Sequence, residues 1–305
     1  MELFHFTITD TKERLDKLVH SHLTQFSRVQ IHTLIKEGKV MVNGSMAKPG
    51  EKFKGGELVR VELPPTPESN LIAEDMPLNI LYEDDALLVL DKPAGLVVHP
   101  GTGNFSGTLV HGLLGKYPEL AALGDSDEEN EDRVGIVHRL DKETSGLMVV
   151  GRTMDAVRHL SQQFQERLVD KMYIALLEKQ PKSLNGIVDA PIARDARNRK
   201  RMSVQANGRP ARSQFEVTDL DFVGGQALVK VTIFTGRTHQ IRVHMAFIGC
   251  PVVGDILYGR KRRIALDRQF LHATHLAFNH PVTGERMAFD SPLPEELVKV
   301  LGELR

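Results

Sequence analysis

Four apolar side chains recur at helical spacing in residues 11–23, namely Leu15, Leu18, Val19 and Leu23. Ser27 is a suitable N-cap for a second helix over 28–37. Short apolar runs at 40–42 and 58–63, with an Asn-Gly turn after the first, predict a small β-ribbon. The pattern therefore predicts a separate small α/β domain over residues 1–64.

The hydrophobic pattern breaks after this first domain. Residues 64–77 contain four prolines and show no periodicity, so we expect a linker at 65–77 and a second domain over 78–305. The second domain has a predicted helix at 154–165. Short apolar runs predict its strands, at 86–90, 134–138, 147–150, 173–177 and 227–234. This mixture is typical of an α+β fold and not of regular β-α-β winding.

One apolar segment carries an unusual set of charges. Residues 135–151 read GIVHRLDKETSGLMVVG, in which apolar runs flank Arg139 and Asp141. Apolar flanks favour burial, and a charged group resists burial unless it is paired or used. The pattern therefore predicts that Asp141 has a partner elsewhere in the chain.

Candidate partners for Asp141 lie further along the sequence. Residues 236–244 read GRTHQIRVH and supply Arg237 and Arg242 directly after an apolar strand. An arginine beside Asp141 would form an ion pair and favour the charged carboxylate. Because Asp–Arg pairs support structure more often than chemistry, a structural pair is the simpler interpretation of the spacing.

Other chemistries find less support in the sequence. His272 and His275, like His239 and His244, are spaced as zinc ligands could be, but neither pair has a convincing third ligand nearby. Ser145 lies in Thr-Ser-Gly and not in the G-x-S-x-G of a nucleophile elbow. Dinucleotide-binding and Walker patterns are missing from the sequence. These observations favour an enzyme that uses a single carboxylate.

Composition restricts the class of protein. The chain has 305 residues, of which 41% are hydrophobic and 26% charged, and Cys250 is its one cysteine. No apolar run is long enough to cross a bilayer, and the first 16 residues lack the apolar centre of a secretory signal. We therefore expect a cytoplasmic protein with no membrane partner and no intrachain disulfide.

The net charge of −1 hides an uneven distribution of charge. Residues 125–132 are rich in acids and are most simply a solvated loop. Residues 194–212 hold one acid, Asp195, against seven bases: Arg194, Arg197, Arg199, Lys200, Arg201, Arg209 and Arg212. On the predicted helix 28–37, Arg28, His32 and Lys36 form a basic stripe, for which a solvated face is the simpler interpretation. The basic residues at 194–212 nevertheless create a positive local field, and the local field, not the net charge, is what attracts a polyanion.

Several longer motifs resemble those of one enzyme family. HRLDKETSGLMVV resembles the signature of the RluA-type pseudouridine synthases, which modify ribosomal RNA. Four further blocks occur in the family's order: LYEDDALLVLDKPAGLVVHPG, KMYIAL, TGRTHQIRVHM and GDILYG. Residues 1–64 resemble the small α-L RNA-binding domain that often precedes this catalytic domain. The resemblance covers almost the whole chain and implies a mixed, largely antiparallel sheet in the catalytic domain.

The resemblance also implies roles for individual residues. Asp141 matches the family's essential aspartate, and Tyr173 matches the tyrosine that lies against the target base. Arg242 matches the basic partner of the aspartate, with Arg237 as the alternative. Arg139 matches the arginine thought to help fill the gap left by a flipped base. The residues expected to contact RNA phosphates are Arg28, His32, Lys36, Arg199, Lys200, Arg201 and Arg237.

A pseudouridine synthase breaks the N1–C1′ bond of uridine, turns the uracil and rejoins it through C5. The base never leaves, so the resemblance implies no second substrate, metal or cofactor. The carboxylate would attack C1′ or assist proton removal at C2′, and the sequence leaves both open. The resemblance thus predicts a monomeric enzyme acting on large-subunit ribosomal RNA. The alternatives are a transfer-RNA or messenger-RNA target, and a non-catalytic RNA-binding or ribosome-assembly protein.

Overall fold

The computed structural model divides the chain into two compact units. One unit comprises Met1–Ile72 with Ala121–Val134, and the other comprises Ala73–Leu120 with Gly135–Arg305. The predicted domain limits at residues 64 and 78 stay a prediction. The structure describes residues 2–9, 13–23, 26, 28–63, 71–101, 103–123, 134–198, 200–259, 264 and 266–305, with only the backbone described at 2 and 28–30.

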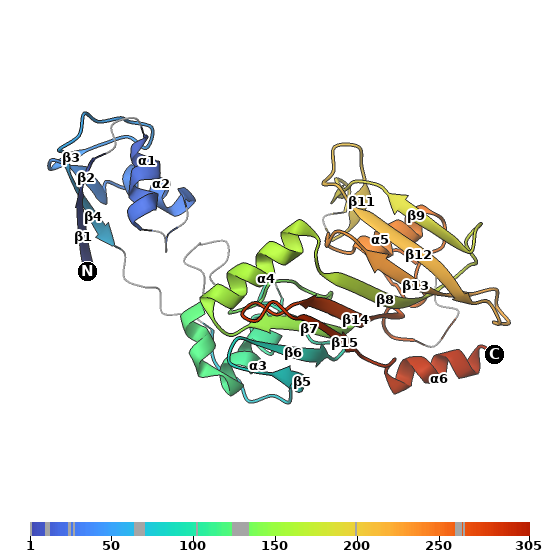
Figure 1. Cartoon of the computed structure of the whole chain (residues 1–305). Coiled ribbons are helices and arrows are strands. Elements are labelled where there is room, and N and C mark those ends of the chain that lie inside the picture. The colour runs from blue at the N-terminus through green and yellow to red at the C-terminus, as the bar shows by residue number, and fades with distance from the viewer. Residues whose placement is uncertain are drawn as a thin grey trace. The chain divides into compact units, whose positions relative to one another are not determined.

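The N-terminal unit combines a four-stranded antiparallel sheet with two helices (Figure 1). Its elements are β1 (Glu2–Thr7), α1 (Leu15–His22), α2 (Arg28–Lys36), β2 (Val40–Val42), β3 (Ser45–Met46) and β4 (Leu58–Leu63), and the sheet order is β1-β4-β2-β3. Leu15, Val19 and Ile31 from the helices pack with Val59 and Val61 of β4 in a buried core.

The elements of this unit follow the predicted pattern closely. Helix α1 begins later than predicted because Arg14 has extended backbone angles and forms its N-cap. The Asn-Gly turn between β2 and β3 is confirmed, and both of its residues, Asn43 and Gly44, have positive φ as such a turn requires. Ser27, the predicted N-cap of α2, lies outside the described residues.

The second unit is built on a nine-stranded mixed sheet. The strand order is β5-β6-β7-β14-β8-β13-β12-β9, with β15 paired to the outer part of β14. The strands are β5 (Asn79–Glu83), β6 (Leu87–Lys92), β7 (Ser145–Gly151), β8 (Asp170–Leu177), β9 (Asn185–Asp189), β12 (Arg212–Asp219), β13 (Ala227–Ile233), β14 (Leu271–Asn279) and β15 (Arg286–Asp290). The pair β7–β14 is parallel and its neighbours in the order are antiparallel. The predicted α+β class with a mixed, largely antiparallel sheet is confirmed.

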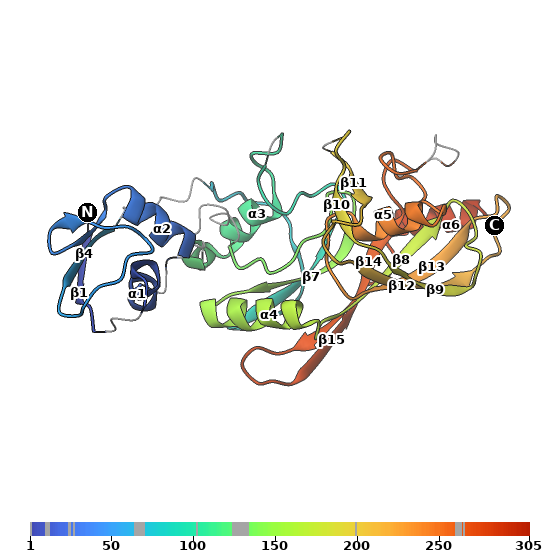
Figure 2. The ribbon, with the colours of Figure 1, turned by 90° about the horizontal axis from the view of Figure 1, so that it is seen from above.

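Helices cover both faces of this sheet (Figure 2). Helix α4 (Met154–Glu166) lies on one face, and α3 (Leu109–Lys116), α5 (Gln240–Phe247) and α6 (Glu295–Glu303) lie on the other. A short 3-10 helix, Pro118–Leu123, follows α3, and β10 (Ile192–Arg194) and β11 (Met202–Val204) form a separate hairpin. Among the described residues, no helix is long and apolar enough to cross a membrane.

Strand β7 is central to the sheet and buried along its whole length. Its neighbours are β6 on one side and β14 on the other, and α4 packs over it, which explains its continuous apolar run. At Gly146, φ is 119°, and an added Cβ would lie 2.3 Å from the backbone oxygen of Ala273. Only glycine therefore permits this close approach of β7 to β14.

The strand predicted at 134–138 is wrong. Gly135 has a φ of 77°, and within this segment Ile136 alone pairs with β7, through a single bridge to Val150. The Val149 amide of β7 donates its hydrogen bond to the side chain of His138, at Nε2 and 3.0 Å, and not to a backbone oxygen. The segment is therefore an irregular strap along β7 that leads to Asp141.

Candidate active site

Asp141 lies in the loop that directly precedes β7. Its backbone oxygen accepts a hydrogen bond from the Thr144 amide at 3.0 Å, which closes a turn just before the strand begins at Ser145. The side chain remains 21% exposed, although Leu140 before it is buried. The chain therefore presents a partly exposed carboxylate on a loop fixed by a buried strand.

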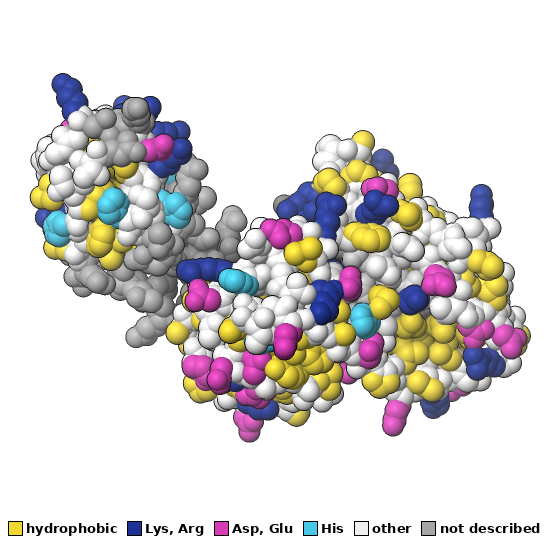
Figure 3. Space-filling view, viewed as in Figure 1, with side chains coloured by type: hydrophobic (Ala, Val, Ile, Leu, Met, Phe, Trp, Pro, Cys, Tyr) yellow, Lys and Arg dark blue, Asp and Glu magenta, His cyan; other side chains and the backbone are white. Residues whose placement is uncertain are grey.

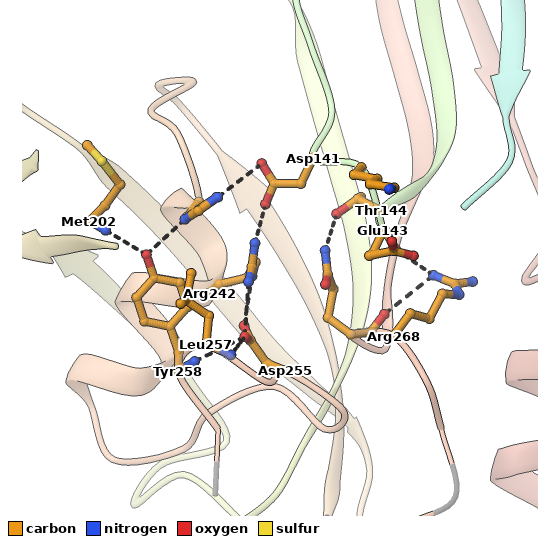
Figure 4. Close-up of polar contacts among 12 residues, drawn as sticks. Asp141, Glu143, Thr144, Met202, Arg242, Asp255, Leu257, Tyr258 and Arg268 are labelled. Carbon is orange, nitrogen blue, oxygen red and sulfur yellow. Dashed lines mark hydrogen bonds and ion pairs between the residues drawn. The ribbon is translucent and has the colours of Figure 1, made fainter. Parts of the chain in front are cut away.

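Arg242 joins Asp141 to a second carboxylate (Figure 4). Its Nη1 donates to Asp141 Oδ2 at 2.8 Å, while Nε and Nη2 donate to the two oxygens of Asp255 at 2.7 and 3.0 Å. Arg242 sits on α5 and its side chain is 8% exposed. Burial alone would lower the pKa of Arg242, but the hydrogen bonds and negative charges of Asp255 and Asp141 reverse this and raise it. The guanidinium is therefore a permanent cation.

Asp255 is the anchor of this arrangement, and no role was predicted for it from the sequence. Its side chain is fully buried and also accepts hydrogen bonds from the amides of Leu257 and Tyr258. Gly254 precedes it with a φ of 75°, and a Cβ there would lie 2.0 Å from the backbone oxygen of Arg268. The GDILYG block contained the signal, since an aspartate after a glycine in a tight turn is suited to receiving backbone amides.

A histidine and a tyrosine form a second contact chain toward Asp141. His239 Nδ1 lies 2.9 Å from the Tyr258 hydroxyl, and His239 Nε2 lies 4.0 Å from Asp141 Oδ1. The Tyr258 hydroxyl also accepts a hydrogen bond from the Met202 amide of β11 at 2.7 Å. The Tyr258 ring lies 5.2 Å from the Arg242 guanidinium carbon and 5.1 Å from that of Arg201. Tyr258 thus connects the β10–β11 hairpin to the residues around Asp141.

Tyr173 approaches the same carboxylate from β8. It is 7% exposed, and burial, followed by the negative charge of Asp141, raises the pKa of its hydroxyl well above the usual value. Among the residues that the structure describes, none hydrogen-bonds this hydroxyl. Tyr173 is therefore a neutral phenol within electrostatic range of Asp141.

The loop that carries Asp141 is held from several sides. The buried Lys92 Nζ donates to the backbone oxygens of Pro93, Leu96 and Lys142, at 2.7, 2.9 and 3.1 Å. Arg268 donates to the Glu143 oxygen at 3.1 Å, and Gln269 donates to the Thr144 hydroxyl at 3.1 Å (Figure 4). These contacts connect three consecutive residues after Asp141 to two other segments, so the carboxylate sits on a rigid support.

The residues expected to contact RNA differ in where the structure places them. Arg139 is exposed, two residues before Asp141, and its charge acts on His239. Lys200 is exposed on the β10–β11 hairpin, near which Lys and Arg side chains gather (Figure 3). Arg201 is half-buried, and within the described part of the chain its Nε has no hydrogen-bond acceptor. Arg199 lies outside the described residues.

Arg237 has a partner other than Asp141, and the helical stripe belongs to the N-terminal unit. Arg237 is half-buried and its Nε donates to the Pro210 oxygen at 3.0 Å, so Arg242 and not Arg237 is the arginine beside Asp141. On α2 of the N-terminal unit, Lys36 is exposed and His32 is half-buried. The side chain of Arg28 is outside the described residues.

The histidines considered as zinc ligands have other partners. His272 Nδ1 lies 2.9 Å from the Ser145 hydroxyl, and His244 Nδ1 lies 2.9 Å from the Ser213 hydroxyl. His275 lies 2.7 Å from the Asp290 carboxylate. Within the described ranges, no group of three His, Cys, Asp or Glu side chains is placed to hold a metal ion.

The chain is similar to known proteins over almost its full length. A family model described as RNA pseudouridylate synthase matches residues 86–247, and an S4 domain model matches residues 13–59. An uncharacterized RNA pseudouridine synthase of Chloroflexus aurantiacus is 44% identical, over 97% of this chain and 92% of that protein. The ribosomal large subunit pseudouridine synthase D of Xanthomonas campestris is 42% identical, over 96% of this chain and 89% of that protein.

Solved structures agree with these sequence matches. Human RNA pseudouridylate synthase domain containing 1 superimposes with a TM-score of 0.57 at 27% identity, over 72% of this chain and 84% of that chain. The matched region 86–247 contains the ion-paired Asp141 and Arg242, and also Tyr173, whose hydroxyl pKa is raised in part by the charge of Asp141. The chain belongs to the RNA pseudouridylate synthase family, with an S4 domain at its N-terminal end.

Proposed function

We propose that this enzyme converts uridine to pseudouridine in large-subunit ribosomal RNA, with Asp141 as the group that acts on the ribose. The observation that carries the proposal is the ion pair between Arg242 Nη1 and Asp141 Oδ2, at a carboxylate that stays 21% exposed. The partial exposure leaves the carboxylate accessible to a substrate while the arginine holds its direction. Relatives named ribosomal large subunit pseudouridine synthase D support the choice of RNA.

Asp141 acts on the ribose in either of two ways. It attacks C1′ as a nucleophile, as the carboxylate of a retaining glycosidase does, or it assists removal of a proton at C2′. Both need a carboxylate held at a fixed angle, and the Arg242–Asp255 pair provides the fixed partner. The Lys92 and Arg268 contacts hold the loop in place while the nucleotide moves.

The remaining groups in the proposal bind and move the base. Tyr173 lies against the uracil, and its neutral hydroxyl is suited to transferring the proton that leaves C5. Arg139 occupies the space left by the extruded base. The reaction balances without another reactant, because the N1–C1′ bond breaks, the C5–C1′ bond forms, C5 loses a proton and N1 gains one.

The basic residues of the hairpin hold the RNA backbone in this proposal. Lys200, Arg201 and Arg199 contact phosphates. Arg237 contributes at the edge of the site, and Arg28, His32 and Lys36 contribute from the S4 domain. The proposed enzyme acts as a monomer in the cytoplasm.

Mapping of pseudouridines in defined RNA tests this proposal. Transcripts of large-subunit ribosomal RNA, small-subunit ribosomal RNA and transfer RNA are incubated with the enzyme, and pseudouridine is mapped by carbodiimide modification and primer extension. The proposal expects product in the large-subunit transcript. Product only in transfer RNA would correct the substrate, and no product in any RNA, including partly assembled large subunits, would favour a non-catalytic RNA-binding protein.

A further inference from the structure

A gap separates Asp141 from the imidazole of His239. Asp141 Oδ2 is bound by Arg242, but Oδ1 faces His239 Nε2 at 4.0 Å. That distance is too long for a direct hydrogen bond, which requires about 3 Å between the heavy atoms. A single hydroxyl oxygen placed to one side of the line between them, about 2.8 Å from each atom, can bind both.

The hydrogen bonds of Tyr258 favour one tautomer of His239. The Tyr258 oxygen accepts from the Met202 amide, which leaves its own O–H free to donate to His239 Nδ1. In that tautomer the imidazole proton sits on Nε2, the nitrogen nearest to Asp141. Burial lowers the pKa of His239, with the charges of Arg242 and Arg139 acting in the same direction and those of Asp141 and Asp255 against it. A neutral ring with Nε2–H is therefore the form that faces the carboxylate.

The backbone of His239 indicates that this placement is specific. His239 has a φ of 57° and a ψ of 20° and is the N-cap of α5, directly before the turn that carries Arg242. Non-glycine residues adopt the left-handed region infrequently, although histidine does so more often than most, and such conformations concentrate at ligand sites. The strain aims the ring toward Asp141 while Arg242 reaches the same carboxylate from the following helical turn.

The chemistry of the reaction identifies the hydroxyl. Whether Asp141 attacks C1′ or assists at C2′, its oxygen approaches the C1′–C2′ edge of the ribose, and the 2′-hydroxyl is the polar group on that edge. This group can accept a hydrogen bond from Nε2–H and donate one to Oδ1 at the same time. We propose that His239 binds the ribose 2′-hydroxyl of the target uridine. The inference rests on the proposed function of Asp141 and makes the site selective for RNA over DNA.

A double-mutant cycle between enzyme and substrate tests this contact. Two RNA oligonucleotides carry either uridine or 2′-deoxyuridine at the target position, and single-turnover rates of pseudouridine formation are measured for the wild type and His239→Leu. With the wild type, the 2′-deoxy substrate reacts more slowly. With His239→Leu, this ratio falls by about fivefold, the effect of one neutral hydrogen bond. An unchanged ratio in the two enzymes would show that the hydroxyl does not bind His239 and would overturn the inference.

A second variant keeps the test valid if His239→Leu folds poorly. Tyr258→Phe retains the imidazole but removes the hydroxyl that orients it, so the ratio is expected to fall by about threefold. His239→Gln, which retains an N–H donor, is expected to recover part of the wild-type ratio. An unchanged ratio in Tyr258→Phe counts against the inference. Failure of the wild type to modify the uridine substrate would instead overturn the proposed function and, with it, this contact.

Discussion

Arg242 and Asp255 face each other through two parallel hydrogen bonds, from Nε to Oδ2 at 2.7 Å and from Nη2 to Oδ1 at 3.0 Å. This geometry fixes the plane of the guanidinium and leaves Nη1 directed at Asp141. Asp255 touches no exposed surface, so it acts through Arg242 and not on the RNA. The carboxylate proposed to react is thus oriented by another carboxylate buried behind it.

Asp255→Asn is expected to destabilise the protein and to slow product formation. The amide keeps the volume of the carboxylate but loses the charge, and breaking one partner of a buried ion pair costs about 3 kcal/mol. Because Arg242 would no longer be held, we expect the single-turnover rate to fall at least tenfold. Urea denaturation and rapid-quench kinetics measure the two effects. Wild-type values for both would contradict the anchoring role, and Asp221→Asn, at an exposed position, is the control.

Arg242→Met is expected to reduce product formation far more than Arg237→Met. Both changes remove one arginine from the same short segment, but only Arg242 lies beside Asp141. Loss of that partner leaves two carboxylates without their shared cation and frees the Asp141 side chain. Single-turnover rates under saturating enzyme separate this effect from RNA binding. Equal losses in the two variants would exclude a specific role for the Arg242–Asp141 pair.

The stability of the catalytic unit is expected to fall in acid because of His138. Burial, together with the charge of Lys171, lowers the pKa of His138 to about 3, and its Nε2 accepts a hydrogen bond from Val149. The unfolded state, with a pKa near 6.5, binds a proton that the folded state does not. The contribution of His138 to the free energy of unfolding is therefore complete above about pH 6.5. As the pH falls toward 3 this contribution is lost, by up to about 1.4 kcal/mol per pH unit.

Urea denaturation between pH 6.5 and pH 4.5 measures this dependence. In His138→Gln the amide oxygen can replace Nε2 as the acceptor for Val149 but does not titrate. The free energy of unfolding of the variant should therefore fall less steeply than that of the wild type. Parallel curves for the two proteins would show that His138 takes up its proton without unfolding.

Removal of residues 1–64 is expected to weaken RNA binding and to reduce its dependence on salt. The S4 domain has its own sheet and core, so the catalytic unit should remain folded without it. For each phosphate that the protein no longer binds, the log–log salt slope falls by about 0.7 on single-stranded RNA. Filter binding at roughly 50 to 300 mM salt measures the affinity and so provides the slope. An unchanged slope would mean that this domain does not contact phosphates.

Hydrophobic pattern predicted the regular parts of the fold well. The predicted strands at 147–150 and 227–234 correspond to β7 and β13, and the helix at 154–165 corresponds to α4. These elements have strong periodic or continuous apolar runs, and their packing follows from that pattern. Strand β14 was missed because His272, Thr274 and His275 interrupt its apolar residues. The structure shows that these side chains bond to Ser145, Ser291 and Asp290 from neighbouring segments.

The candidate site was predictable only in part, because its contacts join residues that are far apart in the sequence. Asp141 and Arg242 are 101 residues apart. The residue pattern suggested Arg237 or Arg242 as the partner of Asp141, and only the resemblance to a family selected Arg242. Asp255, Tyr258 and Lys92 were not predicted, because their contacts depend on tertiary folding. Lys92, for example, donates to an oxygen 50 residues away. The strand at 134–138 failed because the positive φ at Gly135 and the side-chain acceptor His138 replace regular pairing.

The most direct test of the central role of Asp141 compares wild type with Asp141→Asn on RNA tritiated at uridine C5. Formation of the C5–C1′ bond releases that tritium, so its appearance in solvent reports the reaction itself. We expect release by the wild type, and none by Asp141→Asn, which should still bind the RNA with near wild-type affinity. Release by Asp141→Asn at a rate close to that of the wild type would contradict the central role of this carboxylate.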